Sequence, residues 1–409
     1  MSPRPRHVVI LVENLPVPFD RRPWQIAQSL HASGRKVSVI CPKMYEYTAA
    51  RERLSGIDIC RYPSREGSSP LGWILEYLNA IFWMTWHCWR IHLRSPIDAI
   101  HACNPPDLLF LVALPLRMFC GVKFLFDHHD LNPEVYVAKF GRKDLVYRAL
   151  CLFEKWTYRL ATVALTTNES FRRIAVARSK ARASRIFVVR NAPKPGRLTS
   201  GPPVPELREG FAHVVGYIGV MNKQDGLDLL LEAARRVVHE HGRSDVLFAL
   251  IGDGPELPAL RAMATRMSLE ANVRFLGRIA DGQRISDWLN TASVCVCPDP
   301  RNEMNDHSTM TKIVEYMALG RPTVAFDLAE SIHSAGDSAA WATNNDPSRM
   351  ARLIVELLDD EPRRNEMGAR ARARYDSLLS WPRQEAALLA AYRRLLDGEE
   401  QDPDQGEKS

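Results

Sequence analysis

Short apolar segments alternate with helix-length amphipathic stretches along the whole chain, and the pattern occurs twice. In the first half the apolar segments are 8–12, 37–40, 99–102, 124–126, 163–165 and 186–189. The pattern restarts after residue 212 with apolar segments at 214–219, 246–251, 273–277, 294–297 and 323–326. Nearly continuous aliphatic runs between helices are typical of parallel strands that are covered on both faces. The chain therefore predicts an α/β fold with two successive doubly wound, Rossmann-like domains.

Residues 191–212 interrupt this pattern and mark a domain boundary. They contain five prolines and three glycines within 22 residues, a density that is typical of a linker. We expect a first domain over residues 1–190 and a second over 213–378. A helix over 379–396 is predicted to cross back onto the first domain, and the acidic segment 397–409 is predicted to be disordered. Ligands in such sheets bind beyond the carboxyl ends of the strands, which predicts a central cleft that both domains face.

The cysteine spacing and the charge distribution exclude several classes of protein. The eight cysteines form no CxxC pair, so Cys41, Cys103, Cys295 and Cys297 are predicted to be core thiols in a reducing cytosol. No signal peptide precedes the first apolar segment, which favours a cytoplasmic protein. The formal net charge is +6, and the basic residues are scattered without an aromatic stacking platform. Nucleic acid is therefore not expected as a partner.

Residues 305–322 contain the most informative local motif. The helical period of its apolar residues predicts one buried face, formed by Met310, Ile313, Val314, Met317 and Ala318. Asp306 or Ser308 is predicted to cap this helix, and Gly320 ends it. A capped start offers backbone N–H groups and a positive dipole end to a phosphate, and Glu315 lies where it is able to reach a ribose. The alternative is an amphipathic helix with a solvated outer face, on which Lys312 is the ion-pair partner of Glu315.

The order of motifs along the chain resembles the retaining group 1 glycosyltransferases of the GT-B fold (glycosyltransferase family 4). Residues 312–324 are similar to the second half of the family's E-x7-E motif, and 126–134 resembles its D-x-H-E segment. Residues 252–256 and 273–277 match two further landmarks, and the resemblance extends over 8–396. It implies that the first domain lies on the acceptor side and that the second binds a nucleotide sugar.

The resemblance also implies individual roles for matching residues. Glu315 is the residue that binds the donor ribose, Ser308 and Thr309 hold the diphosphate through their backbone, and His129 contacts the donor sugar. His129 and Glu315 are thus the expected catalytic residues. The expected donor-binding set is Gly219, Lys223, Gly252, Asp253, Gly254, Arg278, His307, Ser308, Thr309, Lys312 and Glu315.

Three residues depart from the family pattern. His307 stands where the family has its first glutamate, eight positions before Glu315, with Asp306 beside it. Val220 and Asp225 stand where the family places an arginine and a lysine that neutralise the diphosphate. Stabilising the charge of the leaving group is a large part of such a transfer, so Lys223 or Lys312 is expected to supply the missing positive charge.

The loop after the first apolar segment, residues 14–22, is a second ligand candidate. Its position predicts that Asp20, Arg21 or Arg22 contacts the acceptor. The alternative is a rigid proline loop in which Asp20 caps the next helix. The loop has no glycine-rich dinucleotide fingerprint, which argues against an NAD enzyme. His128 and His129 have no third ligand at suitable spacing, so neither a metal nor another cofactor is expected.

Residues 73–94 contain four tryptophans beside basic side chains, and their apolar runs are too short to span a bilayer. A buried helix is one interpretation. We favour a helix that rests on a membrane surface, which predicts peripheral contact with the inner membrane face.

The sequence is therefore interpreted as a retaining glycosyltransferase that moves a sugar from a UDP- or GDP-linked donor to a glycan or lipid-linked glycan acceptor in polysaccharide biosynthesis. Closure of the domains would assemble the site. One alternative is a catalytically weakened partner subunit that binds nucleotide sugar without transfer, which Val220, Asp225 and His307 favour. A GT-B sugar-nucleotide epimerase is the other.

Overall fold

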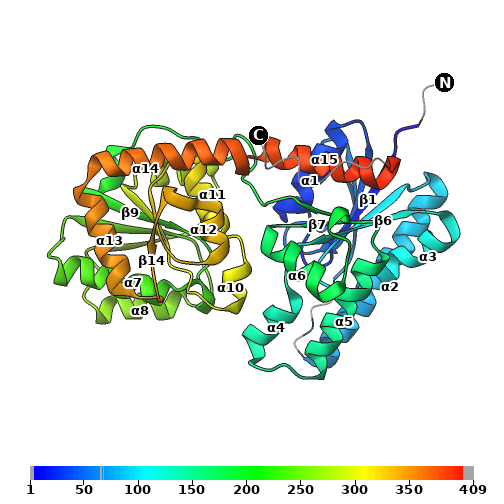
Figure 1. The fold of residues 1–409 in the computed structure, drawn as a ribbon, viewed down its shortest axis with the longest axis horizontal. Helices are drawn as coiled ribbons and strands as arrows, with labels where there is room; N and C mark the ends of the chain where they lie inside the picture. Colours follow the sequence, from blue (N-terminus) through cyan, green and yellow to red (C-terminus); the bar gives the residue numbers. More distant parts are fainter. Residues whose placement is uncertain (1–3, 65–66, 68, 399–409) are drawn as a thin grey trace. The chain divides into compact units, whose positions relative to one another are not determined.

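The computed structural model describes residues 4–64, 67 and 69–398, and the chain divides into two compact units (Figure 1). The N-terminal unit consists of Met1–Arg190 and Gln384–Ser409, and the C-terminal unit of Asn191–Arg383. Each unit has a parallel or predominantly parallel sheet with helices on both faces. The predicted architecture of two doubly wound α/β units is confirmed. The predicted acidic tail lies, from residue 399 onward, outside the described residues.

The sheet of the N-terminal unit has the strand order β3-β4-β2-β1-β5-β6-β7-β8, and only β3 is antiparallel to its neighbour. Its strands are β1 (His7–Leu11), β2 (Lys36–Lys43), β3 (Arg51–Leu54), β4 (Ile57–Pro63), β5 (Ala99–Cys103), β6 (Lys123–His128), β7 (Val163–Thr166) and β8 (Ile186–Val188). Its helices are α1 (Arg21–Ala32), α2 (Pro70–Arg94), α3 (Phe110–Cys120), α4 (Asn132–Phe140), α5 (Leu145–Leu160), α6 (Glu169–Ser179), η1 (Ala183–Arg185) and α15 (Trp381–Asp397). The apolar pattern does not indicate β3 and β4, because Asp58 and Arg61 interrupt the run of β4.

The sheet of the C-terminal unit has the order β11-β10-β9-β12-β13-β14 and is parallel throughout. Its strands are β9 (His213–Ile218), β10 (Val246–Ile251), β11 (Val273–Gly277), β12 (Val294–Cys297), β13 (Thr323–Phe326) and β14 (Ala339–Ala342). Its longer helices are α7 (Leu227–Arg235), α8 (Leu257–Arg266), α9 (Gly282–Thr291), α10 (Glu303–His307), α11 (Thr311–Ala318), α12 (Ala329–Ala335), α13 (Pro347–Asp359) and α14 (Glu361–Arg374). Its single helical turns are η2 (Pro205–Arg208), η3 (Lys223–Asp225), η4 (Arg236–Glu240), η5 (Gly336–Ser338) and η6 (Tyr375–Leu379).

The order β11-β10-β9-β12-β13-β14 is that of a dinucleotide-binding Rossmann sheet, in which ligands sit at the carboxyl ends of the central strands. The sequence pattern missed β14, because three of its four residues are alanine, which has a low strand propensity. The core is made of the aliphatic strands, and Cys41, Cys103, Cys295 and Cys297 are buried free thiols within it.

The proline-rich segment 191–212 is part of the C-terminal unit rather than an isolated connection. The Thr199 backbone N–H donates to the Ser286 hydroxyl of α9 at 3.0 Å, and the Asn290 amide donates to the Thr199 carbonyl at 2.8 Å. Leu198 packs against the apolar cluster beneath α9. The segment is therefore held against α9 at several points.

The last helix, α15, belongs to the N-terminal unit from Gln384 onward. The Gln384 side-chain carbonyl accepts from the backbone N–H of Arg190 at 2.9 Å. Tyr392 is fully buried, and its hydroxyl lies 2.7 Å from Nδ1 of His101 on β5. The end of the chain therefore completes the interior of the first unit.

Candidate functional site

Two helices follow strand β12 where the sequence predicts one. Asn302 caps α10 by accepting hydrogen bonds from two backbone N–H groups of that helix. The predicted caps have other partners, because the Asp306 carboxylate accepts from a backbone N–H of α12 and the Ser308 hydroxyl donates to the Met304 carbonyl. The prediction that Asp306 or Ser308 caps the motif helix is wrong. Helix α11 begins at Thr311 without a side-chain cap.

The expected diphosphate loop lies directly before α11. His307 is the last residue of α10, and Ser308 and Thr309 connect the two helices; all three are half-buried. The Ser308 backbone N–H donates to the Asn305 carbonyl at 3.0 Å, so its predicted contact with a diphosphate does not fit the structure. The Ile313 N–H donates to the Met310 carbonyl at 3.1 Å, and the N–H groups of the first two residues of α11 have no acceptor within the helix. The turn therefore presents both polar side chains and backbone donors at the carboxyl edge of the sheet.

Glu315 lies one turn into α11, and its carboxylate is largely buried. Its Oε1 accepts a hydrogen bond from the Arg197 guanidinium, which makes a charge-assisted pair. The alternative in which Lys312 pairs with Glu315 is wrong. Arg197 comes from the proline-rich segment, where a lone arginine carries no periodic or motif signal, so it was not among the predicted site residues.

Lys312 is buried and has two carboxylate partners. Its Nζ lies 2.6 Å from Oδ2 of Asp299 and 3.5 Å from Oδ1 of Asp225, and it stands 5.2 Å from the centre of the Tyr217 ring. Burial by itself would lower the pKa of Lys312, but Asp299 outweighs it and raises the pKa. Lys312 therefore stays charged. Two carboxylates already balance that charge, which does not fit the predicted role of neutralising a diphosphate.

Asp299 was also missed, although its place two residues after strand β12 is a signal for a ligand-edge residue. Burial raises the pKa of Asp225, and the Lys312 ammonium opposes that rise. Asp225, at the position where the family has a lysine, is thus an anionic partner of Lys312 on α11.

The expected donor-binding glycines lie where the loops after β9 and β10 approach each other. A Cβ on Gly252 would stand 1.8 Å from the Gly219 carbonyl oxygen, and one on Gly254 would stand 2.4 Å from the Met221 carbonyl oxygen. A Cβ on Gly219 would meet the Tyr217 hydroxyl at 2.5 Å. Close packing of backbone therefore requires glycine here, whether or not a phosphate is bound.

The remaining expected donor contacts are exposed. Lys223 is an exposed cation in η3, and Arg278 is exposed just after β11. Asp253 is exposed between the two glycines, and its carboxylate accepts from the Gly254 backbone N–H at 2.8 Å. Lys223 and Arg278 therefore remain the accessible cations among the expected donor-binding residues.

In the N-terminal unit, Asp127 at the end of β6 is the centre of a buried charge cluster. Both of its oxygens accept from the Arg22 guanidinium, at 2.7 and 2.9 Å, and Nε2 of His101 lies 3.4 Å away. Burial would raise the pKa of Asp127, but Arg22, His101 and His129 outweigh it and hold the pKa well below its usual range. The Arg22 side chain is largely buried and also donates to a backbone carbonyl. The predicted acceptor contact by Arg22 therefore does not fit the structure.

His129 follows this cluster and is the more accessible of the two histidines. Its Nδ1 lies 3.8 Å from Asp127, its side chain is 12% exposed, and its backbone N–H donates to the Asn104 side chain. Burial would lower the pKa of His129, but Asp127 and Asp130 outweigh it and raise the pKa. His128 is fully buried against Tyr158, and burial lowers its pKa to about 3. Of these two histidines, His129 is therefore the one that is partly accessible and whose raised pKa favours the charged form.

The loop between β1 and α1 carries two further acidic groups, of which Asp20 lies near this cluster. Asp20 is the N-cap residue of α1. Burial raises the pKa of its carboxyl, and His129 and a backbone hydrogen bond from Arg22 oppose the rise. Arg21 is exposed. Glu13, which the sequence analysis missed, follows β1 and is buried, and burial raises its pKa to about 8. Its signal in the sequence is its place after the first strand.

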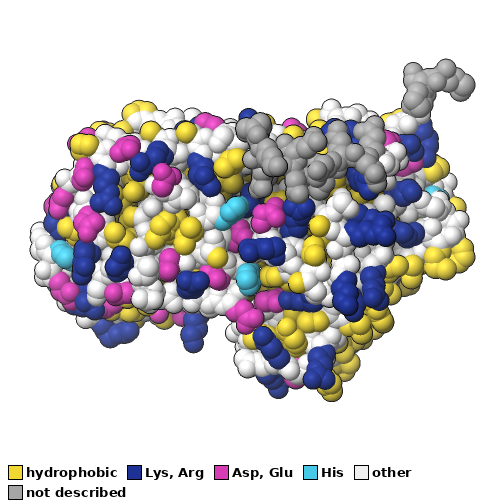
Figure 2. All heavy atoms as spheres, in the orientation of Figure 1, with side chains coloured by type: hydrophobic (Ala, Val, Ile, Leu, Met, Phe, Trp, Pro, Cys, Tyr) yellow, Lys and Arg dark blue, Asp and Glu magenta, His cyan; other side chains and the backbone are white. Residues whose placement is uncertain are grey.

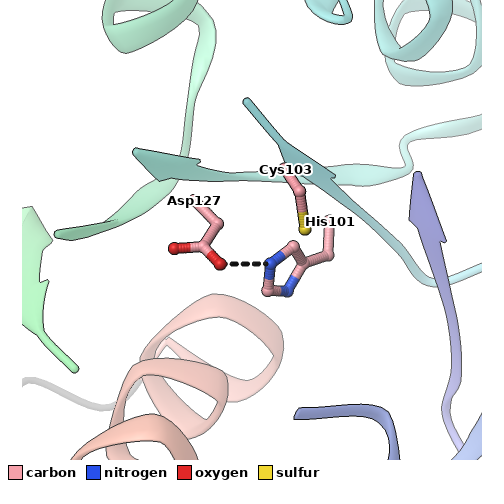
Figure 3. Close-up of side chains that lie close together, drawn as sticks. All are labelled: His101, Cys103 and Asp127. Atoms are coloured by element: carbon pink, nitrogen blue, oxygen red, sulfur yellow. Dashed lines mark ion pairs between the residues drawn. The ribbon is translucent and has the colours of Figure 1, made fainter. Parts of the chain in front are cut away.

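Three buried side chains are close enough to hold a metal ion: His101, Cys103 and Asp127 (Figure 3). Arg22 binds both oxygens of Asp127, and Nδ1 of His101 faces the Tyr392 hydroxyl. Burial raises the pKa of the Cys103 thiol well above its usual value, which opposes the thiolate that a metal needs. A cation here would also displace the Arg22 guanidinium, so the donor set does not fit a metal.

The chain is similar to known proteins over both units. Residues 20–192 match the family described as glycosyl transferase 4-like domain, and residues 212–360 match the family described as glycosyl transferases group 1. A GDP-mannose-dependent monoacylated alpha-(1-6)-phosphatidylinositol monomannoside mannosyltransferase from Corynebacterium glutamicum is 28% identical over 159 residues, which are 38% of this chain and 40% of that relative. The matches span about half the length, or less, of the curated relatives.

Solved structures are similar over nearly the whole chain. Sucrose-phosphate synthase from Thermosynechococcus elongatus superposes with a TM-score of 0.74 at 17% identity, covering 96% of this chain and all of that one. HepE from Anabaena, solved in complex with UDP and glucose, superposes with a TM-score of 0.70 at 16% identity, covering 95% of this chain and 99% of that one.

Two Rossmann-like units of this topology place the protein in the GT-B class. The chain belongs to the group 1 glycosyltransferases, because family matches cover both of its units. The family and the fold that the motifs predicted are both confirmed.

Proposed function

We propose that this protein transfers a sugar from a nucleotide diphosphate donor to a glycan or lipid-linked glycan acceptor in polysaccharide biosynthesis, with retention at the anomeric carbon. The observation that carries the proposal is Glu315, which occupies the family's motif position on α11 with its Oε1 on Arg197. Its second oxygen is then available to accept from a ribose hydroxyl. A relative that uses GDP-mannose and a similar structure that binds UDP support both donor classes.

In this proposal the turn before α11 holds the diphosphate. The N–H groups at Thr309 and at the helix start donate to it, and the exposed cations Lys223 and Arg278 balance its charge. The Ser308 N–H already donates to the Asn305 carbonyl at 3.0 Å and has no part in this contact. The proposal assigns no phosphate contact to Lys312, because Asp299 and Asp225 already bind its ammonium.

His129 is proposed to contact the donor sugar. Its raised pKa favours an imidazolium, which is able to donate to a sugar hydroxyl or to the leaving diphosphate. The acceptor hydroxyl attacks the anomeric carbon from the face that the diphosphate leaves, and the bond to the diphosphate oxygen breaks as the new glycosidic bond forms. The hydroxyl proton passes to the leaving diphosphate, and no metal or other cofactor takes part.

A second candidate function is a partner subunit that binds nucleotide sugar without transfer. The pairing of Lys312 with Asp225 favours it, because the two positions that bring positive charge to the diphosphate in the family hold valine and aspartate here.

We also propose peripheral contact with the cytoplasmic membrane face through α2. No helix within the described ranges is both long and apolar enough to cross a bilayer.

The test is a screen of UDP- and GDP-sugars, with binding measured by calorimetry and turnover by release of UDP or GDP. Glu315→Ala is expected to weaken donor binding by about 1.5–3 kcal/mol, or roughly 10- to 140-fold, because it removes a charged hydrogen-bond acceptor. Glu356→Ala is the matched control, since Glu356 is also paired with an arginine in the same unit but lies on α13.

Unchanged donor affinity in Glu315→Ala would contradict the assignment of Glu315 to the donor ribose. Binding without release of nucleotide, in the presence of candidate acceptors, would favour the partner subunit. An epimerase would convert the sugar while leaving it attached to the nucleotide, which analysis of the recovered donor distinguishes from transfer.

A further inference from the structure

Exposed apolar side chains concentrate on four neighbouring helices of the N-terminal unit. Among the described residues, 20 large hydrophobic side chains are exposed, and 16 of them lie on α2, α3, α4 and α5. The C-terminal unit, of similar size, contributes three. We call this set the four-helix face; it consists of Leu71, Ile74, Leu75, Leu78, Phe82, Trp86, Leu93, Leu111, Met118, Phe119, Val135, Phe140, Leu145, Val146, Leu152 and Trp156.

Helix α2 contributes to this face along its whole length. Leu71, Leu78, Phe82 and Trp86 recur at helical spacing on its outer side, and each is more than half exposed. The opposite side of the same helix buries Ala80, Met84, His87 and Cys88 against the core. Because core packing accounts only for that inner side, the outer apolar stripe requires another explanation.

The four helices form one continuous surface. Helix α2 packs against α3, and both α3 and α4 pack against α5. The Trp73 ring lies 6.2 Å from the Phe140 ring of α4, and the Phe110 ring lies 6.4 Å from the Trp156 ring of α5. Figure 2 shows hydrophobic side chains gathered along the edge that α2 and α5 form, with Lys and Arg beside them. A contiguous apolar patch of this extent marks an interaction site.

Basic side chains clearly outnumber acidic ones beside the four-helix face. The four helices and the α4–α5 loop carry nine Lys and Arg residues and four acidic residues. Glu134 and Glu154 are buried on Arg178, and Asp144 caps the start of α5. Lys139 stands 5.2 Å above the Trp73 ring, so cations and aromatic rings intermingle at this edge. The occupant of the face is therefore expected to be anionic as well as apolar.

A second copy of the chain does not satisfy this requirement. A two-fold symmetric interface brings the same patch together from both subunits, so basic residues would meet basic residues. A bilayer with anionic headgroups supplies negative charge at its surface and hydrocarbon just beneath it.

We propose that the four-helix face docks on an anionic lipid bilayer, with its apolar side chains among the acyl chains and its Lys and Arg at the headgroups. The docking extends the membrane contact proposed above for α2 to α3, α4 and α5, and it rests on that part of the proposed function. It would hold the N-terminal unit beside a lipid-linked acceptor.

The test is co-sedimentation of the full chain with vesicles of phosphatidylcholine alone and of phosphatidylcholine mixed with phosphatidylglycerol. We expect binding to the mixed vesicles that is at least tenfold stronger than to the neutral ones and that falls as salt is raised. The variant Phe82→Ser/Trp86→Ser/Leu145→Ser/Leu152→Ser and the variant Lys139→Glu/Lys143→Glu/Arg148→Glu should each lose binding at least tenfold. All seven side chains are exposed, so the fold should be retained, which far-UV circular dichroism checks.

Matched controls come from the C-terminal unit. Ile332→Ser/Leu378→Ser and Arg349→Glu/Arg352→Glu remove exposed apolar or basic groups there and should bind vesicles as the unchanged protein does. If the serine variant fails to fold, the glutamate variant still decides the result.

Three results would overturn the proposal: no sedimentation with the mixed vesicles, equal binding by surface and control variants, or a stable dimer in light scattering that the serine variant dissociates. Donor binding is measured separately and is expected to be the same in all these variants. A failure of membrane docking is thereby distinguished from a failure of the proposed transferase function.

Discussion

Glu315 and Lys312 are three residues apart on α11, yet each pairs with a residue far away in the sequence. Arg197, which binds Glu315, is 118 positions earlier, and Asp299, which binds Lys312, is 13 positions earlier. The helical i, i+3 spacing makes a local pair possible but is worth only a few tenths of a kcal/mol. Partners that tertiary packing holds in place are therefore able to replace a local pair between Lys312 and Glu315.

Glu13 permits a prediction about pH at the residue scale. Its folded pKa of about 8 lies above its ordinary value of 4.5, because burial disfavours the carboxylate. The native state therefore keeps a proton that the unfolded chain releases, and stability falls as the pH rises from about 4.5 to about 8.

Glu13→Gln removes this proton linkage. The variant should gain stability relative to the unchanged protein as the pH is raised across that window, which thermal melts at pH 5, 6, 7 and 8 would measure. Asp253→Asn changes an exposed carboxylate and is the control. A constant difference in Tm between Glu13→Gln and the unchanged protein at every pH would contradict a buried, protonated Glu13.

At the scale of elements, the loops after β9 and β10 depend on their glycines. Gly252 has a φ of +145°, and a Cβ there would overlap the Gly219 carbonyl oxygen at 1.8 Å. Gly252→Ala is therefore expected to destabilise the protein by about 2–4 kcal/mol, through steric overlap and backbone strain.

Chemical denaturation of Gly252→Ala measures this loss, with Gly201→Ala as the control. A Cβ on Gly201 would meet only the Asn290 amide nitrogen at an ordinary 3.6 Å, so little change is expected. Equal stability of the two variants would mean that the β9 and β10 loops do not approach each other as described.

Element boundaries near the motif were harder to predict than the elements themselves. Residues 302–308 contain Asn302, Asp306 and Ser308, each able to cap a helix start. Asn302 caps α10, which leaves α11 to begin after a turn. Sequence pattern cannot rank such competing caps, because the choice depends on the α12 backbone that binds Asp306.

At the scale of the whole molecule, the last helix in the sequence stabilises the first unit. Tyr392→Ala should destabilise the N-terminal unit by about 3–5 kcal/mol, because it empties a fully buried aromatic site and removes a hydrogen-bond partner of His101. Tyr392→Phe keeps the packing and should cost about 1–3 kcal/mol for the lost hydrogen bond.

Hydrogen exchange resolves where the loss occurs. In Tyr392→Ala, β5 and β6 should lose protection while β9 to β13 of the C-terminal unit retain it. Loss of protection confined to the C-terminal unit would contradict the assignment of α15 to the N-terminal unit. Arg394→Ala, on the same helix but half-buried, is the control.

The sequence by itself determined the two parallel α/β units, the family and the position of the Glu315 motif. These features are local, since hydrophobic period and motif spacing are set by neighbours in the chain. Only the tertiary structure decided which charges meet: Arg22 with Asp127, Arg197 with Glu315, and Lys312 with Asp299. Each pair joins segments that tertiary packing brings together. A charge removed from water is stable only beside a partner, and the tertiary structure determines which partner lies close enough.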